Sequence, residues 1–180
     1  MARVVNMTVL CRLCETFDLS VLAARDDRFV YDPHIFTAAR FRSGAPKYTA
    51  ALFANGHVTL TGVKTRGEAV QAIKHFCRVL CDVNATSVEC VSLRVANHVG
   101  TFDAGQKLHL VELYAHLRDR GCTYETELFP GLIFPCKSLG VTITFFASGK
   151  VNFTGFKRIQ ELRRIQTHLE FIVGNYRKKS

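Results

Sequence analysis

Two stretches of the chain carry nearly the same sequence, and this repeat decides the fold. The first is Phe53-Ala54-Asn55-Gly56-His57-Val58-Thr59-Leu60-Thr61-Gly62-Val63-Lys64, and the second is Phe146-Ala147-Ser148-Gly149-Lys150-Val151-Asn152-Phe153-Thr154-Gly155-Phe156-Lys157. Seven of the twelve positions are identical, and the second stretch begins 93 residues after the first (146 − 53 = 93). At the same spacing, Tyr31-Asp32-Pro33-His34-Ile35-Phe36 is followed by Tyr124-Glu125-Thr126-Glu127-Leu128-Phe129. Because this spacing is close to half of the 180 residues, we expect one domain over 1–180, made of two repeats at 1–90 and 91–180.

Both repeats have the same expected order of elements. A strand and a short helix open each repeat, at 4–10 and 19–24 in repeat one and at 90–101 and 107–118 in repeat two. Three strands follow, at 36–42, 48–54 and 57–61 and at 129–135, 141–147 and 150–154. A long amphipathic helix closes each repeat, the first of them after the capping-box pattern Thr65-Arg66-Gly67-Glu68. Asp18 is the expected N-cap of the helix at 19–24, and Tyr176-Arg177-Lys178-Lys179 ends the chain as a basic tail.

Composition excludes several classes of protein. Hydrophobic residues make up 48% of the chain, which is enough for a packed core and too much for a disordered protein. No apolar run approaches the roughly 20 residues that a membrane span needs, and the N-terminus lacks the pattern of a signal peptide. The 7 Cys are an odd number, which favours reduced thiols in a nuclear or cytosolic protein. The net charge of +9 favours an anionic partner, most commonly a nucleic acid.

Side chains alternate along a strand, so each strand of the repeat has a face that the helices cover and a face that they leave open. We expect the covered positions to be Leu52, Val58 and Leu60 in repeat one and Ile143, Phe145, Val151 and Phe153 in repeat two. The opposite positions are Ala51, Phe53, Thr59 and Thr61 in repeat one and Thr144, Phe146, Asn152 and Thr154 in repeat two. If the helices all lie on one side, this second, partly apolar face is an interaction surface.

The spacing of the phenylalanines adds to this interpretation. With hairpin turns centred near 44.5 and 137.5, Phe36 faces Phe53 and Phe129 faces Phe146. A short loop at Asn55-Gly56 places Phe53 opposite Thr59. Taken singly, each phenylalanine is more typical of a core. Four of them at mirrored positions favour the open face instead.

The paired repeats, the segment Tyr124-Glu125-Thr126-Glu127-Leu128-Phe129-Pro130-Gly131-Leu132-Ile133-Phe134 and the two Gly-x-Val-x-x-Thr-Gly-x-Lys runs resemble the core domain of the TATA-box-binding protein family. The resemblance extends from about Asn6 to the C-terminus, with one extra residue needed between Asn97 and Phe129. It implies a saddle-shaped antiparallel sheet of about ten strands with helices on the convex side. The concave side of such a sheet sits on the minor groove of double-stranded DNA.

The resemblance also implies a role for each DNA-contacting residue. The wedges that open base steps are Phe36, Phe53, Phe129 and Phe146. Hydrogen bonds to the groove come from Asn6, Asn97, Thr61 and Thr154, and Val99 packs on the groove floor. Arg42 matches a phosphate contact, and the saddle is flanked by Lys64, Lys150 and Lys157.

This chain departs from the family pattern at several groove-facing positions. Polar or small residues replace the usual aliphatic ones at Thr8, Ala51, Thr59, Thr144 and Asn152. The arginine that the family usually has in repeat two is Pro135 here, which removes a phosphate contact and a backbone donor. We therefore expect DNA binding with a preference relaxed or shifted from the consensus TATA element.

The same resemblance implies protein partners. Glu125, Glu127 and Leu128 match positions that contact TFIIB, and Lys74, His75 and Arg78 fall where basic residues contact TFIIA. The alternative for both sets is an ordinary solvated surface. We expect a nuclear protein, and the sequence leaves open a homodimer of the free protein through its apolar concave face.

Other kinds of site find less support in the sequence. Cys11-x-x-Cys14 and Cys77-x-x-x-Cys81 have spacings seen in zinc sites, but buried reduced thiols are the favoured interpretation. No catalytic or phosphate-binding motif is present, so neither an enzyme nor a cofactor is expected. Two functions remain: a minor-groove initiation factor, or an interaction module that recruits or sequesters initiation factors while binding DNA weakly.

Overall fold

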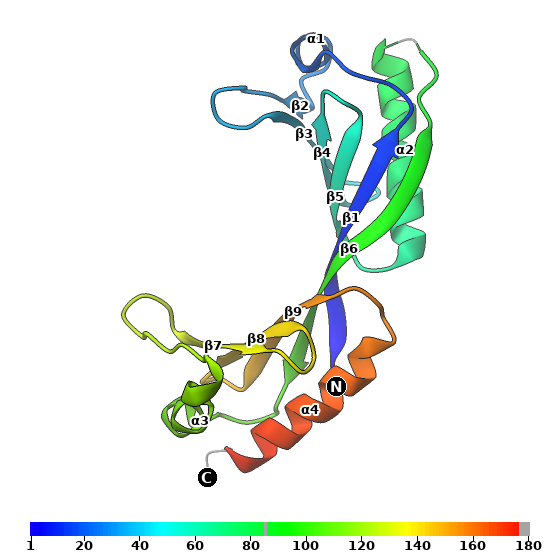
Figure 1. Ribbon diagram of the computed structural model, residues 1–180. Coiled ribbons are helices and arrows are strands. Elements are labelled where there is room, and N and C mark those ends of the chain that lie inside the picture. The colour runs from blue at the N-terminus through cyan, green and yellow to red at the C-terminus, as the bar shows by residue number, and fades with distance from the viewer. Residues whose placement is uncertain (85, 177–180) are drawn as a thin grey trace. The chain divides into compact units, whose positions relative to one another are not determined.

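The computed structural model describes residues 1–84 and 86–176 (Figure 1). The strands are β1 (Arg3–Leu13), β2 (Phe29–Val30), β3 (Ala38–Ser43), β4 (Tyr48–Phe53), β5 (His57–Val63), β6 (Cys90–Asp103), β7 (Gly131–Cys136), β8 (Val141–Phe146) and β9 (Lys150–Phe156). The helices are α1 (Leu19–Arg25), α2 (Arg66–Asn84), α3 (Leu110–Leu117), the short 3-10 helix η1 (Arg118–Arg120) and α4 (Glu161–Asn175). The residues at 177–179 of the expected basic tail lie outside the described residues.

The nine strands belong to one antiparallel sheet in the order β2-β3-β4-β5-β1-β6-β9-β8-β7. The chain divides into two compact units, an N-terminal unit (Asn6–Ala96) and a C-terminal unit (Met1–Val5 with Asn97–Ser180). Each unit contains one repeat, and every hairpin within it is antiparallel. The two repeats and the α+β class that the sequence predicts are therefore confirmed.

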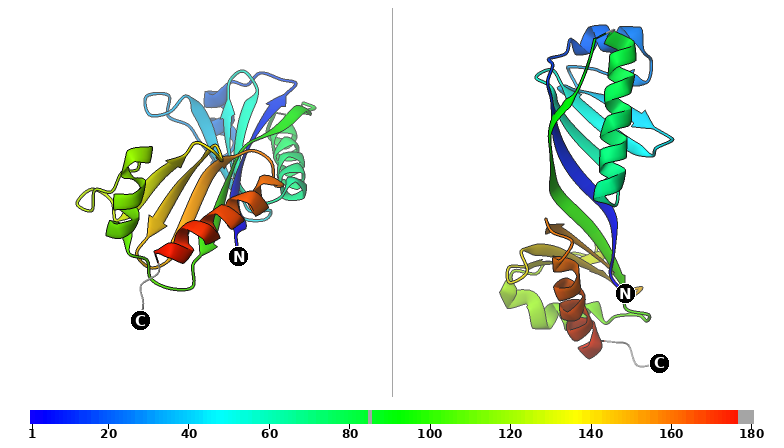
Figure 2. Two further views of the ribbon diagram at one scale, coloured as in Figure 1. Left: turned by 60° about the horizontal axis from the view of Figure 1, so that its bottom comes forward. Right: turned by 90° about the vertical axis from the view of Figure 1, so that its right-hand side faces the viewer.

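In the N-terminal unit, both helices pack on the same face of the sheet. The core joins Leu22 of α1 and Phe76 of α2 to the strand residues Leu52, Val58 and Leu60, all of which are buried. Figure 2 shows α2 running alongside the strands that it covers. The predicted covered face of repeat one is confirmed by this packing.

The C-terminal unit repeats the arrangement with a core of its own. Leu113 of α3 and Leu169 of α4 pack on the strand residues Ile143, Phe145, Val151 and Phe153, which are all buried. Both helices pack on the face to which these buried strand residues point, so the opposite face of the strands has no helix of its own unit over it.

Side-chain caps begin the helices where the sequence predicts them. Asp18 Oδ1 accepts from the N–H groups of Ser20 and Val21 at 3.0 and 3.1 Å, which confirms it as the N-cap of α1. Thr65 Oγ1 accepts from Glu68 N at 3.1 Å at the start of α2. The Glu68 carboxylate accepts a hydrogen bond from Lys64 N at 2.7 Å. In the standard capping box it would accept from the N-cap residue itself, which is one residue later.

The predicted strand register was wrong by two residues. Phe53 pairs with Ala38 rather than Phe36, Phe146 pairs with Gly131, and Thr59 lies opposite Ala51. The β4–β5 loop is short because Gly56 N donates to Phe53 O at 2.9 Å, which sets His57 beside Phe53. A shift of two leaves every side chain on its predicted face, so the division into two faces survives the error.

The elements also differ from the prediction in their bounds and number, and the strands expected from 36 and 129 begin at Ala38 and Gly131. The helix expected at 107–118 begins at Leu110, because Leu108 N donates to Ala147 O and His109 N to Tyr176 O. The described residues form nine strands rather than about ten. The counterpart of β2 in repeat two is reduced to a single bridge between Thr123 and Ile133. Every helix in residues 1–84 and 86–176 is too short or too polar to cross a membrane.

Candidate nucleic-acid interface

The open face of the N-terminal unit consists of side chains that line up across neighbouring strands. Strand pairing sets out one row of Leu10, Thr59, Ala51 and Arg40, and a second row of Thr61, Thr49 and Arg42. All of these residues are half-buried or exposed, in contrast to their buried neighbours along each strand. The surface is therefore small and hydroxyl-rich in the middle of the sheet and cationic toward β3.

The open face of the C-terminal unit has the same two rows. The first contains Thr101, Asn152, Thr144 and Ile133, and the second contains Val99, Thr154, Thr142 and Pro135. Ile133 and Pro135 occupy the positions that Arg40 and Arg42 hold in repeat one. The two open faces thus share their polar centre but differ in charge at the outer strand.

An aromatic pair stands at the end of each open face. The ring centroids of Phe36 and Phe53 lie 6.1 Å apart at 65°, and those of Phe129 and Phe146 lie 5.9 Å apart at 68°. Phe36 is 43% exposed and Phe129 is 40% exposed. These edge-to-face contacts hold each ring against its partner while leaving apolar surface on the open side.

Matching turns hold the outer ring of each pair. Asp32 O accepts from both Ile35 N and Phe36 N, and Glu125 O accepts in the same way from Leu128 N and Phe129 N, at 2.9–3.1 Å. Each outer phenylalanine therefore lies just before β3 or β7 and reaches its partner diagonally. In repeat two the ring lies over Gly131, where a Cβ atom would come within 2.6 Å of it.

The side-chain amides of Asn6 and Asn97 are oriented by the backbone. Asn6 Oδ1 accepts from Gly62 N and Asn97 Oδ1 accepts from Gly155 N, both at 2.8 Å. Because each oxygen is occupied, each NH2 group is directed away from that backbone contact as a donor. Asn97 Nδ2 donates one hydrogen to Thr154 Oγ1 at 2.9 Å, which leaves its second hydrogen for a ligand.

The remaining residues expected at the interface lie at its margins. Arg42, Lys64, Lys150, Lys157 and Asn152 are exposed, whereas Thr8 and Val99 are half-buried on the open faces of β1 and β6. Pro135 lies on β7, the last strand of the sheet, where a residue without an N–H group is tolerated.

The residues expected to contact protein partners are placed differently in the two sets. Glu125, Glu127 and Leu128 are exposed on the turn before Phe129, and Leu128 is 82% exposed. Lys74 and Arg78 are exposed on α2. His75 is half-buried, and its Nδ1 lies 2.8 Å from the Tyr48 hydroxyl, so this imidazole already has an intramolecular partner.

Sequence reasoning missed several members of the two open faces. They are Leu10, Arg40, Thr49, Thr101, Ile133 and Thr142. Extending the strand alternation by one more residue pair would have found them, since each lies two positions from a residue that was identified. Arg40 adds a second positive charge to that of Arg42 on β3 of the N-terminal unit.

The cysteines form no metal site in the part of the chain that the structure describes, where no three potential ligands gather. Burial raises the pKa of the Cys11 and Cys77 thiols to about 12, which keeps both protonated. Cys81 Sγ accepts from Val88 N and Cys14 Sγ accepts from Glu89 N, each at 3.2 Å. These thiols act as packing groups and weak acceptors within the N-terminal unit.

Comparison with known proteins gives a consistent picture. Residues 1–83 and 92–174 match the family model described as transcription factor TFIID, or TATA-binding protein. The TATA-box-binding protein of Methanocaldococcus jannaschii is 32% identical over 162 residues, covering 90% of this chain and 87% of that protein. That of Saccharomyces cerevisiae is 29% identical over 175 residues, covering 97% and 70%. Mouse TATA box-binding protein-like 2 is 31% identical over 173 residues, and the chain spans 49% of its length.

The fold agrees with a solved structure of the same kind. The structure of Methanococcus jannaschii TBP superposes with a TM-score of 0.80 and 28% identity, covering 97% of this chain and 98% of that one. This agreement over nearly the whole chain confirms the predicted fold.

Proposed function

Because the chain belongs to the TATA-box-binding protein family, we propose that it is a nuclear transcription initiation factor that binds and bends promoter DNA through the minor groove. The family is one of transcription factors and not of enzymes. The observation that carries the proposal is the pair of open sheet faces, each with an aromatic pair at its end. The repeats at 1–90 and 91–180 would then act as one DNA-binding domain.

The chemistry of these faces suits an A·T-rich minor groove. Such a groove lacks the guanine amino group, so a surface of small and hydroxyl side chains can approach its floor. Threonine hydroxyls and the NH2 groups of Asn6 and Asn97 would donate to the adenine N3 and thymine O2 acceptors. The exposed edges of Phe36 and Phe129 would enter base steps, where unstacking costs a few kcal/mol that contact with the bent duplex offsets.

The preference for particular DNA sequences would arise from the deformability of the base steps and from the polar side chains at the centre of the interface. Pyrimidine–purine steps such as TA unstack most easily, so they would be favoured at the two wedge positions. Thr59, Thr144 and Asn152 place polar groups where an aliphatic surface would exclude water. We propose that this relaxes or shifts the preference away from the consensus TATA element.

The two ends of the interface would hold the DNA backbone unequally. Arg40 and Arg42 are exposed on β3, whereas their counterparts on β7 are Ile133 and Pro135. Phosphate contacts supply affinity through counterion release, so the repeat-one end would contribute more of the salt-dependent binding.

A mobility-shift assay tests the proposed function directly. A duplex with a TA-rich site should form a complex that a duplex with G·C substitutions does not form, at one stated salt concentration. Selection from random duplexes would then define the preferred sequence. Equal binding to both duplexes would contradict minor-groove recognition of A·T pairs.

Asn97→Asp should separate the donor role of this residue from its structural role. Aspartate keeps the oxygen that accepts from Gly155 N, so the melting temperature should be close to wild type. It loses the NH2 donor and places a carboxylate against groove acceptors, so DNA affinity should fall about tenfold to a hundredfold. Asn175→Asp on α4 is the control and should bind normally. Wild-type affinity in Asn97→Asp would remove this residue from the interface.

We also propose that the turn before Phe129 recruits a TFIIB-like factor and that Lys74, His75 and Arg78 on α2 contact a TFIIA-like factor. Glu125→Arg with Glu127→Arg reverses two exposed charges, so recruitment of TFIIB to the DNA complex should be lost. DNA affinity should stay equal or rise, because the protein gains positive charge. The control, Glu112→Arg with Glu170→Arg, makes the same change in charge on α3 and α4. Unchanged recruitment would exclude the acidic turn from the interface.

The second candidate is an interaction module that binds initiation factors and holds DNA weakly. Thr59, Thr144 and Asn152, which do not exclude water as an aliphatic surface would, and Pro135, which lacks a phosphate contact, favour it. TFIIB binding without a detectable DNA complex would support this alternative. A homodimer of the free protein through the open face stays a prediction, which sedimentation with and without a DNA duplex tests.

A further inference from the structure

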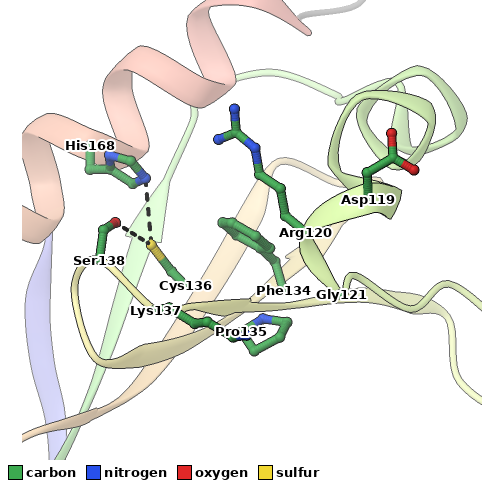
Figure 3. Close-up of a pocket in the computed structure, with 9 residues that line it drawn as sticks. All are labelled: Asp119, Arg120, Gly121, Phe134, Pro135, Cys136, Lys137, Ser138 and His168. Atoms are coloured by element: carbon green, nitrogen blue, oxygen red, sulfur yellow. Dashed lines mark hydrogen bonds between the residues drawn. The ribbon is translucent and has the colours of Figure 1, made fainter.

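A cavity of about 460 Å³ lies in the C-terminal unit at the end of β7. Its walls come from η1 and the following Gly121, from the segment Phe134–Ser138, and from His168 on α4 (Figure 3). Leu132, Phe134 and Cys136 are the buried, helix-facing residues of β7. Phe134 and Cys136 therefore line the cavity from the helix-covered side, whereas Pro135, an open-face residue, lines it at the edge strand β7, where its Cγ lies 3.8 Å from the Cβ position of Gly121.

The two repeats differ in the residues around the cavity. In repeat one, the Arg28 guanidinium lies 5.5 Å from the centre of the Phe41 ring, and the Tyr48 hydroxyl lies 2.8 Å from His75 Nδ1. The bridge between Thr123 and Ile133 corresponds to the pairing of Val30 with Arg40, so the spacing of 93 residues holds in this region.

At that spacing the ring and the imidazole are kept, as Phe134 and His168, but the two side chains that contact them in repeat one are replaced. Gly121 stands in place of Arg28, and Val141 stands in place of Tyr48. A cation and a phenol that repeat one supplies from within are thus absent from the same place in repeat two. The volume of the cavity lies within the range typical of small-molecule sites.

The cavity is rich in positive charge. Arg120 extends from η1 toward α4 and Lys137 lies in the β7–β8 turn (Figure 3). In residues 1–84 and 86–176, neither side chain forms an ion pair. The acidic residue of the lining, Asp119, has a side chain that is 90% exposed and lies 3.8 Å from Arg118. The cations of the cavity are therefore left for an external anion.

Hydrogen-bonding groups gather beside these charges. Cys136 Sγ lies 3.4 Å from Ser138 Oγ and 3.6 Å from His168 Nε2. Arg164 Nη2 donates to Ser138 O at 3.3 Å and holds the turn against α4. Burial, followed by the positive charges of Arg120 and Arg164, lowers the pKa of His168.

We propose that this cavity binds a phosphomonoester, with its dianionic group held by Arg120 and Lys137 and its organic part against Phe134 and Pro135. A planar guanidinium matches phosphate oxygens in a two-point contact, and the Ser138 hydroxyl can donate to a third oxygen. A bare phosphate would fill a small part of the space, so the apolar wall requires a larger ligand. The phosphate belongs either to a free mononucleotide or to a phosphorylated side chain of a partner protein.

Calorimetric titration of the full chain at about 0.15 M salt tests this assignment. The probes are adenosine 5′-monophosphate against adenosine, a phosphoserine peptide against its serine form, and inorganic phosphate. We expect binding only of phosphorylated probes. Tighter binding of the nucleotide identifies a free ligand, and tighter binding of the peptide identifies a phosphorylated partner. Inorganic phosphate that binds as tightly as both would overturn the contact with Phe134 and Pro135.

Variants distinguish binding in the cavity from nonspecific attraction of anions to a basic protein. Arg120→Gln should weaken phosphomonoester binding about tenfold or more, whereas Arg118→Gln, in the same turn but outside the cavity, should have little effect. Equal losses in Arg118→Gln and Arg120→Gln would overturn the proposal.

The test is independent of the DNA-binding proposal. Because Arg120 lies on η1 and not on a strand of the open face, Arg120→Gln should bind a TA-rich duplex with wild-type affinity. A protein that binds no DNA at all could still bind a phosphomonoester, so failure of one proposal is distinguishable from failure of the other.

Discussion

Phe129→Ala with Phe146→Ala should abolish the bent DNA complex. The two rings support each other at 5.9 Å, so removing both leaves no apolar group to enter the base step at this end. The duplex would then have to stay unkinked, and the open face of the C-terminal unit would lose its contact with the groove. We expect affinity for a TA-rich duplex to fall at least about a hundredfold, which corresponds to about 3 kcal/mol. Mobility shift measures the affinity, and fluorescence transfer between the duplex ends measures the bend.

Two comparisons make this result specific. Phe36→Ala with Phe53→Ala removes the mirrored pair and should cause a loss of the same kind, because those rings have nearly the same separation and exposure. Phe171→Ala removes an aromatic ring that is 73% exposed on α4 and should leave DNA binding unchanged. If the Phe129 and Phe146 double variant stays folded and bends DNA as the wild type does, the wedge assignment is wrong.

The rows of side chains on the open faces show what strand periodicity can predict from the sequence and what it cannot. Alternation assigns Thr59 and Thr154 to the open face from the sequence alone, because successive side chains in a strand point to opposite sides. It does not set the register, since a shift of two residues leaves the faces unchanged. The contact between Phe36 and Phe53 was therefore expected for an incorrect reason: the rings meet diagonally, from a turn that precedes β3.

The cavity could not be predicted in the same way. Its lining includes Gly121, a position where the repeats differ, whereas a repeat is detected from positions where they agree. Tyr48 and His75 are 27 residues apart in the sequence, and only the folded unit shows that they form a hydrogen bond. Without that bond, nothing in the sequence indicates that Val141 removes the partner of an imidazole.

The repeated Phe-Ala-x-Gly motif has a structural cause that the sequence left unexplained. The turn after β4 accepts hydrogen bonds from Leu13 N at Gly56 O and from Phe17 N at Ala54 O, both at 2.8 Å. In repeat two, Gly149 O and Ala147 O accept from Ala104 N and Leu108 N at 2.9 and 3.1 Å. These bonds bring each turn against the chain that leaves β1 or β6. A Cβ atom at Gly56 or Gly149 would overlap the carbonyl oxygen of Glu15 or Gln106.

Gly149→Ala should therefore destabilise the protein far more than the loss of a flexible residue explains. Gly149 has φ +91°, a conformation that costs an alanine about 1–2 kcal/mol, and the new methyl group must also displace the backbone at Gln106. We expect the free energy of unfolding to fall by about 3 kcal/mol or more, measured by urea denaturation with circular dichroism.

Gly105→Ala is the matched control, because Gly105 has φ +74° in the same unit but no atom within 4 Å of the new Cβ position. The Gly105→Ala variant has only the conformational cost, so its free energy of unfolding should fall by about 1–2 kcal/mol. The difference between the two variants therefore measures the contact of the turn with Gln106. If both variants lose the same free energy of unfolding, the backbone at Gln106 moves aside at no energetic cost. The glycine in both repeats would then be explained by its backbone conformation alone.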